Sequence, residues 1–552
     1  PFLAVFLAKG CSGTSGAQLT VKVGPMETPK EEGYTFAFVF LMASGHINPS
    51  FPVARALVAE GHKVHYLGRE QMREAIEDTG ATFHNDIHVQ KDFYEGRDPS
   101  LWGALGSLQQ EHQLKGSQTK AFLMLKELAA EQMMPSTLRW LREIRADAVF
   151  CDPMWNLDVM FAAKVAKIPC LGLLTFAGPG CLSVAWPNIL NATGSTPAEV
   201  LAERQTFEAL QKCQRRLEMK GITVEDYLQP MGMLPVSLLK LTLVTTSKAL
   251  ADPMPLEMEK AYTKAGHDFV FVGPLLDKAG ATRAAGHKFH GEHTPGNATV
   301  TDVLSLAKAA KAAGRQVVLV SLGTILTGDH PEYGWRARCQ IDGQATGASC
   351  KELCQSTWSA VFNLLGSDQA TAPLILVSLG PQEDALDHVD GGASSLPPNV
   401  VCEKILPQVD LMRLGVDVFV HHGGQNSFME ALSFGIPMVV CPGWSDQLIN
   451  GAKAESLKVG LKVDRPMGKG DVLADELKHY RHAISRALND VLSHPSFREN
   501  AAKISTLLRD GETPGESTGV PLAVQLLVKE AQGSRPKAKI QRVNVNSHLG
   551  GD

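Results

Sequence analysis

Short apolar runs alternate with amphipathic segments along most of this chain. Runs of strand length lie at Tyr34–Met42, Lys63–Leu67 and Asp147–Asp152, and helical patterns lie at Ser50–Glu60 and Trp155–Lys167. Such runs are typical of strands buried on both faces of a parallel sheet. Because 552 residues are too many for one core, the alternation predicts an α/β protein with two Rossmann-like domains.

The same pattern continues to the end of the chain. Further strands are expected at Ile168–Thr175, Leu239–Thr246, Asp268–Val272, Gln316–Ser321, Leu374–Leu379, Val400–Leu406, Val416–Val420, Pro437–Cys441 and Gly460–Val463. The predicted organisation is a disordered leader (1–32), an N-terminal domain (33–275), a Gly- and Thr-rich linker (276–300), a C-terminal domain (301–515), a further helix (516–533) and a disordered basic tail (534–552).

Composition adds exclusions rather than a function. The net charge is −5, so there is no basic footprint for nucleic acid. The ten cysteines lack the paired spacing of a zinc site and favour a reduced, cytoplasmic compartment. The sequence contains no stretch of about 18 apolar residues, so no membrane span is predicted. An N-terminal targeting segment is the alternative to a disordered leader.

The stretch Ile405–Gln447 carries the clearest chemistry. An apolar strand is followed by His421-His-Gly-Gly-Gln-Asn-Ser427 and by a helical pattern that ends near Gly435. The free N–H groups of a helix start, together with its dipole, form an anion site. Gly423 and Gly424 would let the backbone approach a diphosphate closely.

Side chains in this stretch suit a nucleotide sugar. His422 and Ser427 can donate to phosphate. Asn426 and Glu430 are four residues apart on one helix face, so Glu430 can accept from ribose while Asn426 meets phosphate. The pair Asp446-Gln447 follows the next strand and can receive sugar hydroxyls. The alternative is a glycine-rich turn that binds nothing, as in some Rossmann-like domains.

These residues resemble a known family signature. The matching pieces are Pro407-Gln408, His422-x-Gly424-x-Asn426-Ser427, Glu430, Gly435-x-Pro437 and Asp446-Gln447. In this order and spacing they resemble the donor-binding signature of the family-1 UDP-glycosyltransferases, inverting enzymes with the GT-B fold of two facing Rossmann-like domains. The resemblance implies that the helix at 516–533 returns to the N-terminal domain.

Two positions depart from the plant members of that family. Ile405 and Gln425 stand where those members have tryptophan, and the first of those tryptophans stacks on uracil. An aliphatic contact from Ile405 is therefore expected in place of stacking. The His-Gly-Gly-x-Asn-Ser form is similar to microbial members that act on macrolides, carotenoids or sterols.

A second resemblance lies near the N-terminus. Gly45-His46-Ile47-Asn48-Pro49 is similar to the loop that carries the catalytic base of this family, which implies that role for His46. Neutral imidazole suits the removal of a hydroxyl proton near pH 7. Asp152, at the end of a buried strand, would orient the histidine. The alternatives are that His46 caps the loop or the helix and that Asp152 caps a helix beside Pro153.

The expected site residues fall into two further groups. The donor-binding group is Ser321, Gly323, Thr324, Ile405, Leu406, Gln408, His422, Gly424, Gln425, Asn426, Ser427, Glu430, Asp446 and Gln447. The acceptor-binding group is Met154, Trp155, Phe176 and Trp186, for which a purely structural place in the core is the alternative.

Three segments have weaker patterns. Helices are expected at Thr119–Gln132 and Pro135–Arg145, and an aromatic loop at Phe176–Asn191. The polar, glycine-rich segment Gly328–Glu352 is longer than its counterpart in the family. We expect it to be a disordered surface insertion, with a lid over the cleft as the alternative.

The resemblance implies transfer of a hexose, most simply glucose, from a UDP-sugar to a hydroxyl of a small lipophilic acceptor. No metal is expected, and the sequence has no Asp-x-Asp pair. A sterol, carotenoid, polyketide or phenol would fit as acceptor. The alternatives are a UDP-sugar epimerase of the same fold, a non-catalytic protein that binds sugar nucleotides or lipids, and an enzyme that uses TDP-sugars.

Overall fold

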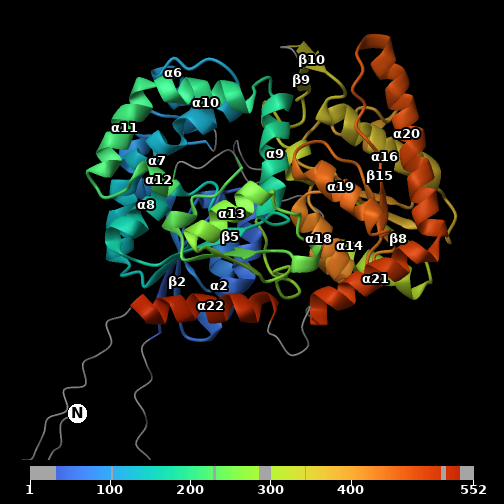
Figure 1. The fold of residues 1–552 in the computed structure, drawn as a ribbon. Coiled ribbons are helices and arrows are strands. Elements are labelled where there is room, and N and C mark those ends of the chain that lie inside the picture. The colour runs from blue at the N-terminus through green and yellow to red at the C-terminus, as the bar shows by residue number, and fades with distance from the viewer. Residues whose placement is uncertain are drawn as a thin grey trace, which may run out of the picture. The chain divides into compact units, whose positions relative to one another are not determined.

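Two parallel β-sheets organise the chain in the computed structural model (Figure 1). The structure describes residues 33–100, 103–227, 232–284, 300–341, 344–510 and 518–534. Both sheets belong to one compact unit, Tyr34–Asp552. The predicted leader, the linker residues 285–299 and the tail beyond Ser534 lie outside the described residues.

The first sheet has seven parallel strands in the order β3-β2-β1-β4-β5-β6-β7. The strands are β1 (Thr35–Val39), β2 (Lys63–Gly68), β3 (Thr82–Asn85), β4 (Ala148–Cys151), β5 (Cys170–Leu174), β6 (Leu241–Val244) and β7 (Asp268–Phe271). The strand order reverses between β1 and β4, and the carboxyl ends of strands at such a switch point flank a crevice.

The second described sheet repeats this topology. Its six parallel strands have the order β12-β11-β8-β13-β14-β15, which reverses between β8 and β13. The strands are β8 (Val317–Ser321), β11 (Leu374–Ser378), β12 (Val400–Glu403), β13 (Val418–His421), β14 (Met438–Val440) and β15 (Gly460–Lys462). A separate antiparallel pair is formed by β9 (Cys339–Ile341) and β10 (Gln344–Thr346). The fold is thus two Rossmann-like domains, the GT-B arrangement.

Helices separate the strands in both domains. Those of the N-terminal domain are α1 (Ser44–Ile47), α2 (Phe51–Ala59), α3 (Arg73–Asp78), α4 (Asp86–Val89), α5 (Lys91–Tyr94), α6 (Gly103–Glu111), α7 (Gln118–Glu143), α8 (Leu157–Ala166), α9 (Pro179–Ala192), α10 (Pro197–Thr206), α11 (Glu208–Glu218), α12 (Val224–Tyr227) and α13 (Leu256–Ala265). Those that follow are α14 (Val300–Ala312), α15 (Gly323–Leu326), α16 (Cys350–Leu365), α17 (Gln408–Arg413), α18 (Gln425–Ser433), α19 (Asp446–Ser456), α20 (Gly470–Ser493), α21 (Pro495–Asp510) and α22 (Gly519–Ser534).

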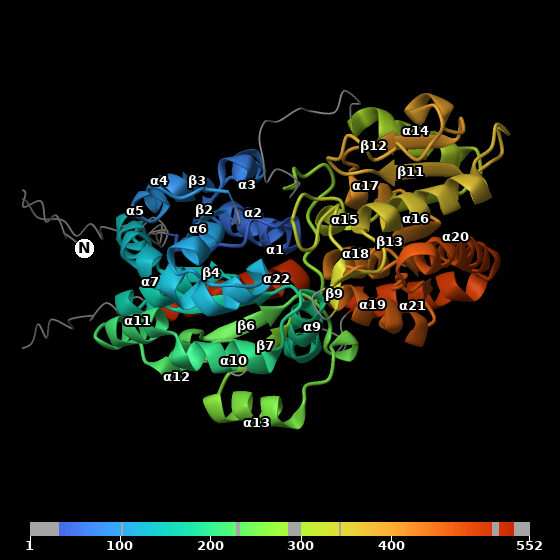
Figure 2. The same ribbon diagram turned by 90° about the horizontal axis from the view of Figure 1, so that it is seen from above.

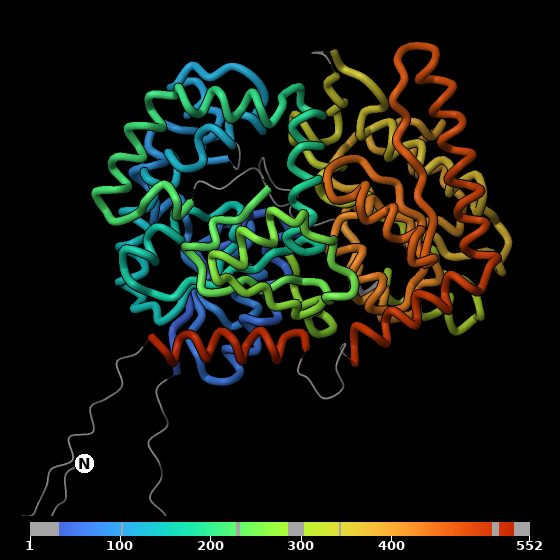
Figure 3. The backbone as a smooth tube through the Cα atoms, viewed as in Figure 1, coloured from blue at the N-terminus to red at the C-terminus, as the bar shows by residue number. Residues whose placement is uncertain are grey.

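The last helix leaves the second domain. α22 packs against α2 and β4. It lies below α2 in Figure 1, and Figure 3 shows the same red helix beneath the first domain. Ala523, Leu527 and Ala531 are each fully buried and join the core around Phe36. Their spacing of four residues gives one apolar face, and burial of that face ties the end of the chain to the first sheet.

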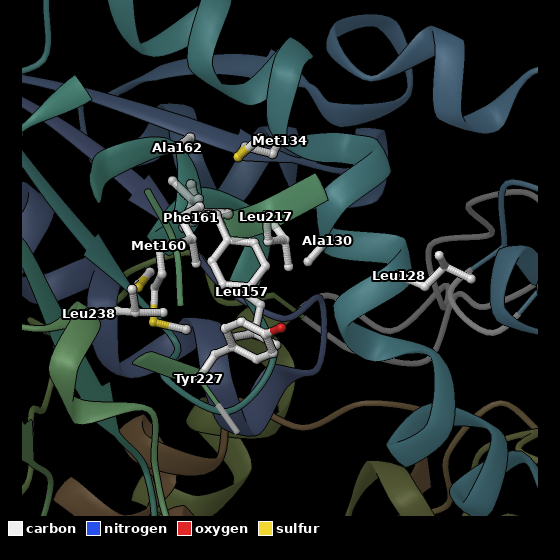
Figure 4. Packing of buried hydrophobic residues seen from close by; sticks show 14 of the residues in the cluster. Leu128, Ala130, Met134, Leu157, Met160, Phe161, Ala162, Leu217, Tyr227 and Leu238 are labelled. Carbon is white, nitrogen blue, oxygen red and sulfur yellow. The ribbon is translucent and has the colours of Figure 1, made fainter. Parts of the chain in front are cut away.

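The core of the N-terminal domain lies where α7 and α8 pack against each other. Phe161 of α8 meets Tyr227 of α12 edge to face, with ring centroids 5.4 Å apart, among Leu157 and Leu217 (Figure 4). This packing holds α8, and therefore the loop between β4 and α8, in place.

Two helix predictions are wrong. The expected break at Pro135 is absent, because α7 runs through it. A proline inside a helix removes one helical hydrogen bond, but Pro135 is exposed and α7 has buried residues from Thr119 to Leu141, so packing outweighs that loss. The expected loop at Phe176–Asn191 is the helix α9. Its first residue is Pro179, a position where a missing N–H has no helical partner to lose.

The prediction of a disordered insertion at Gly328–Glu352 is also wrong for its described residues. Trp335, Ala337 and Cys339 are buried at alternate positions in the core of the second domain. The Trp335 indole nitrogen donates to Asp384 over 2.8 Å, and Ser349 forms a capping box at the start of α16. The segment is therefore an integral part of the domain.

Among the described helices, none has the length and apolar character to span a lipid bilayer.

Candidate active site

A cavity of about 380 Å³ lies between the carboxyl ends of the two sheets. Its walls come from the segments that follow β1, β5, β8 and β13, together with α9, α18 and the start of α19. Figure 2 shows α9 beside α19, on opposite sides of the boundary between the domains. Both switch points therefore open into one cavity of a volume typical for ligand sites.

His46 and Asp152 form a close pair at the first switch point. The Nδ1 atom of His46 lies 2.5 Å from Oδ2 of Asp152. Asp152 is 2% exposed, and its other oxygen accepts from the Met154 N–H over 2.8 Å. With Nδ1 engaged, Nε2 is the ring nitrogen left for a substrate in the cavity.

The helical alternatives for these two residues do not hold. His46 lies inside the single-turn helix α1, where the sequence predicts a loop, and Ala43 is the N-cap. The N-cap of α8 is Asn156 rather than Asp152. Asp152 instead directs both carboxylate oxygens at the histidine and the adjoining backbone.

The second domain contacts the histidine helix directly. The hydroxyls of Ser44 and Thr324 lie 3.1 Å apart, and the Asn426 side-chain amide donates to the Gly45 carbonyl over 2.9 Å. Thr324 and Asn426 thus bridge the domains here. Both side chains still line the cavity.

Two glycines make room for the ring of His422. A Cβ atom on Gly323 would lie 2.2 Å from the ring, and one on Gly424 would lie 2.4 Å from its Nε2. The imidazole is therefore seated between the turns after β8 and β13. This packing requires the glycines without any ligand. Burial lowers the pKa of His422 to about 4, so the ring is neutral at pH 7 and carries no charge.

Glu430 is a buried carboxylate with two partners. Gln408 donates to its Oε2 over 2.7 Å and Arg283 donates to its Oε1 over 2.7 Å. Gln408 also donates to the Ser427 hydroxyl over 3.2 Å. The first residue of α17 is thereby joined to α18 at the wall of the cavity.

The turn that carries Asp446 and Gln447 is held by its own backbone. The Gln447 amide oxygen accepts from the N–H groups of Gly443 and Trp444, at 2.8 Å and 3.0 Å. Ser445 has φ 54° and ψ −128°, a region that favours glycine. Burial raises the pKa of Asp446 to about 6, so its carboxyl is ionised at pH 7 and protonated below that value.

Aromatic side chains of the N-terminal domain lie around the ring of His46. Its ring meets Trp155 and Phe176 edge on, with centroids 6.2 Å and 6.1 Å away. Phe122 packs on Trp155 at 4.4 Å and stacks on Trp186 at 6.1 Å. This wall gives the cavity an apolar half beside the histidine.

Known proteins share this architecture and these segments. Residues 385–508 match the family model of the erythromycin biosynthesis protein CIII-like C-terminal domain. The NDP-glycosyltransferase YjiC of Bacillus subtilis (strain 168) is 20% identical over 501 residues, which cover 90% of this chain and 98% of the relative. The human UDP-glucuronosyltransferase 3A2 is 37% identical over 107 residues, 18% of this chain and 20% of the relative.

These matches indicate a nucleotide-sugar-dependent glycosyltransferase. The solved structure of the glycotransferase of kitacinnamycin has the same fold, with a TM-score of 0.55 and 22% identity, covering 91% of this chain and all of that one.

The glycosyltransferase gathers almost every predicted site residue at this one cavity. Asp152 is the exception, since it lies behind His46 rather than on the wall. The residues that line the cavity are His46, Met154, Trp155, Phe176, Trp186, Ser321, Gly323, Thr324, Ile405, Leu406, Gln408, His422, Gly424, Gln425, Asn426, Ser427, Glu430, Asp446 and Gln447. Ile405 is 50% exposed, and its contact with a base stays a prediction.

Several lining residues of the glycosyltransferase were not predicted. They include Phe122 of α7, Arg283 of the described linker, His330 and Tyr333 of the inserted segment, and Trp444. Tyr333 stacks on His330 at 4.6 Å, and its carbonyl accepts from the Trp444 indole over 3.0 Å. The sequence signal for Trp444 was its place two residues before Asp446; the others lie far from any motif.

Proposed function

We propose that this glycosyltransferase moves a hexose, most simply glucose, from a UDP-sugar to a hydroxyl of a small lipophilic acceptor, with inversion at the anomeric carbon. One observation carries the proposal. The pair of His46 and Asp152 lies on the same cavity as the glycine-rich start of α18. A base and an anion site would therefore face the same pair of substrates.

In the proposed step, His46 Nε2 removes the proton from the acceptor hydroxyl. The acceptor oxygen then forms a bond to the anomeric carbon while the bond from that carbon to the diphosphate oxygen breaks. UDP leaves with the bonding electrons, through a transition state with oxocarbenium character. The Asp152 carboxylate holds the tautomer and stabilises the imidazolium, the role of the aspartate in a catalytic triad.

Hydrogen-bond donors would receive the charge of the leaving diphosphate. The candidates are the N–H groups at the start of α18, the neutral His422 ring, Ser427 and Thr324, because these residues line the cavity. Preorganised donors of this kind stabilise developing charge. The proposal involves no metal, and unchanged turnover in excess EDTA is its check.

The aromatic wall supports the acceptor class. Phe122, Trp155, Phe176 and Trp186 present ring faces and edges beside His46. Flat apolar alcohols such as sterols, polyketides or phenols would bury their surface against these rings. A charged or highly polar acceptor would find few partners there.

The test is turnover of UDP-glucose with a panel of lipophilic alcohols and a matched panel of sugars and amino alcohols. We expect UDP release that depends on a lipophilic acceptor, and a β-glucoside in the product proton spectrum. A retained α-linkage would contradict the inverting mechanism.

The same assay separates the other candidate functions. Conversion of the UDP-sugar without any acceptor would identify an epimerase, and nucleotide binding with no product from any panel would identify a non-catalytic binding protein. Preference for TDP-glucose over UDP-glucose at equal concentration would overturn the choice of nucleotide.

A further inference from the structure

The described end of the interdomain linker, Asp277–Ala284, crosses between the two domains and is held by both. We name this segment the strap. On the N-terminal side, Asp277 accepts from the Arg55 side chain over 3.1 Å, and Ala284 exchanges two hydrogen bonds with the Asn48 side chain, at 2.9 Å and 3.1 Å. On the C-terminal side, the Gly280 N–H donates to Asp410 over 3.2 Å.

These anchors place Arg283 on the wall of the cavity. Its guanidinium donates to Glu430 over 2.7 Å, and the side chain of Glu430 is 5% exposed whereas that of Arg283 is 32% exposed. Arg283 is the only lysine or arginine among the described residues that line the cavity. The neutral ring of His422 adds no permanent charge there.

Electrostatics makes this single cation important. A nucleoside diphosphate carries at least two negative charges, and Glu430 adds a buried carboxylate to the same cavity. A buried carboxylate that lacks a cationic partner is strongly unfavourable, and a bound anion beside it increases the repulsion. Two further lone pairs of the carboxylate remain available for hydroxyl donors when Arg283 and Gln408 occupy the other two.

We propose that Arg283 is a donor-site residue, which compensates the Glu430 carboxylate and supplies the permanent positive charge that a nucleoside diphosphate meets in this cavity. The inference rests on the proposed function and extends it, because it assigns a specificity role to the linker. It predicts that Arg283 strengthens the binding of UDP more than that of uridine. Glu430 contributes to the binding of both ligands, because both contain the ribose.

The test compares UDP and uridine by calorimetry on the full chain and on the variants Arg283→Gln, Arg283→Lys, Glu430→Gln and the double variant Arg283→Gln/Glu430→Gln. We expect Arg283→Gln to weaken UDP roughly tenfold and uridine less than threefold, with Arg283→Lys close to the wild type for UDP. In the double variant, the fold-loss of UDP affinity should be smaller than the product of the two single fold-losses, since the uncompensated carboxylate is gone. Arg413→Gln, which contacts the strap outside the cavity, is the matched control and should bind UDP normally.

Two results would overturn this inference but leave the proposed function intact. One is wild-type affinity for UDP in Arg283→Gln. The other is tighter UDP binding by that variant, which would mean that Arg283 blocks the ribose position of Glu430. Failure of the folded wild-type protein to bind UDP at all would overturn the proposed function as well, so the two failures are distinguishable.

Discussion

Two segments of the C-terminal domain line the same cavity but differ in how their structure arises. Ile405–Gln447 consists of a short loop, α17, β13, a glycine turn, α18, β14 and the start of α19, each specified by local residues. Gly328–Glu352 is polar and glycine-rich, yet it is held by distant partners, with Trp335 bound to Asp384 and Tyr333 to Trp444. Local chemistry makes the first segment predictable, whereas the second depends on contacts that a single sequence does not display.

The inserted segment also contacts α7, the long helix of the N-terminal domain. Glu332 accepts from the backbone N–H groups of Gln118 and Thr119 at the start of α7, and from the Thr119 hydroxyl over 2.8 Å. A carboxylate at a helix N-terminus satisfies free donors and complements the dipole. The insertion therefore joins the two domains beside the cavity.

Among the changes that test this comparison, the removal of the Trp335 side chain should have the largest effect, which is on stability. Trp335 is 1% exposed, so Trp335→Ala should lower the free energy of unfolding by about 4 kcal/mol in urea titrations. Ile405→Ala, at a half-exposed position of the donor segment, should change it by less than about 1 kcal/mol and weaken UDP binding instead. A neutral Trp335→Ala would mean that the insertion is peripheral after all.

The contact of Glu332 with α7 should have an intermediate effect. Glu332→Gln should destabilise the protein by about 1 kcal/mol and raise the KM for acceptor while the KM for the UDP-sugar stays unchanged. Glu95→Gln, on an exposed surface of the N-terminal domain, is the control for loss of one carboxylate. Equal changes in both KM values would show that the contact serves folding rather than the acceptor side.

The smallest expected effect concerns the pH dependence of sugar recognition. Burial raises the pKa of Asp446 to about 6, so the carboxylate that can accept from sugar hydroxyls is present above pH 6 and lost below it. The advantage of UDP-glucose over UDP in affinity should fall about threefold between pH 7 and pH 5.5. In Asp446→Asn this ratio should be independent of pH; a pH dependence that persists would assign it to another group.

The candidate site was largely predictable because its residues sit at places that the topology dictates. Residues that directly follow β1, β4, β8 and β13 meet at the two switch points, so His46 and His422 share one cavity. The reason for Gly424 was not predictable. Its hydrogen side chain is required by the ring of His422, a contact between two motif residues rather than with a ligand.

Other parts of the site required the fold. Phe122 reaches the cavity because α7 continues through Pro135 and packs on α8, and propensity alone predicts a break there. Arg283 reaches it through anchors on both domains. The burial of Trp335 had a weak sequence signal. Apolar and charged residues alternate here, and the side chain of Arg336 is 87% exposed. Such alternation is typical of a strand-like segment.

The most direct test of the account is to separate binding from chemistry in His46→Ala. The account predicts UDP affinity within about threefold of the wild type by calorimetry, together with a loss of glucosyl transfer of at least about a thousandfold, because the donor half of the cavity stays intact while the acceptor loses its base. Transfer at the wild-type rate by His46→Ala, in the presence of normal UDP binding, would contradict the assignment of the His46 and Asp152 pair and the mechanism built on it.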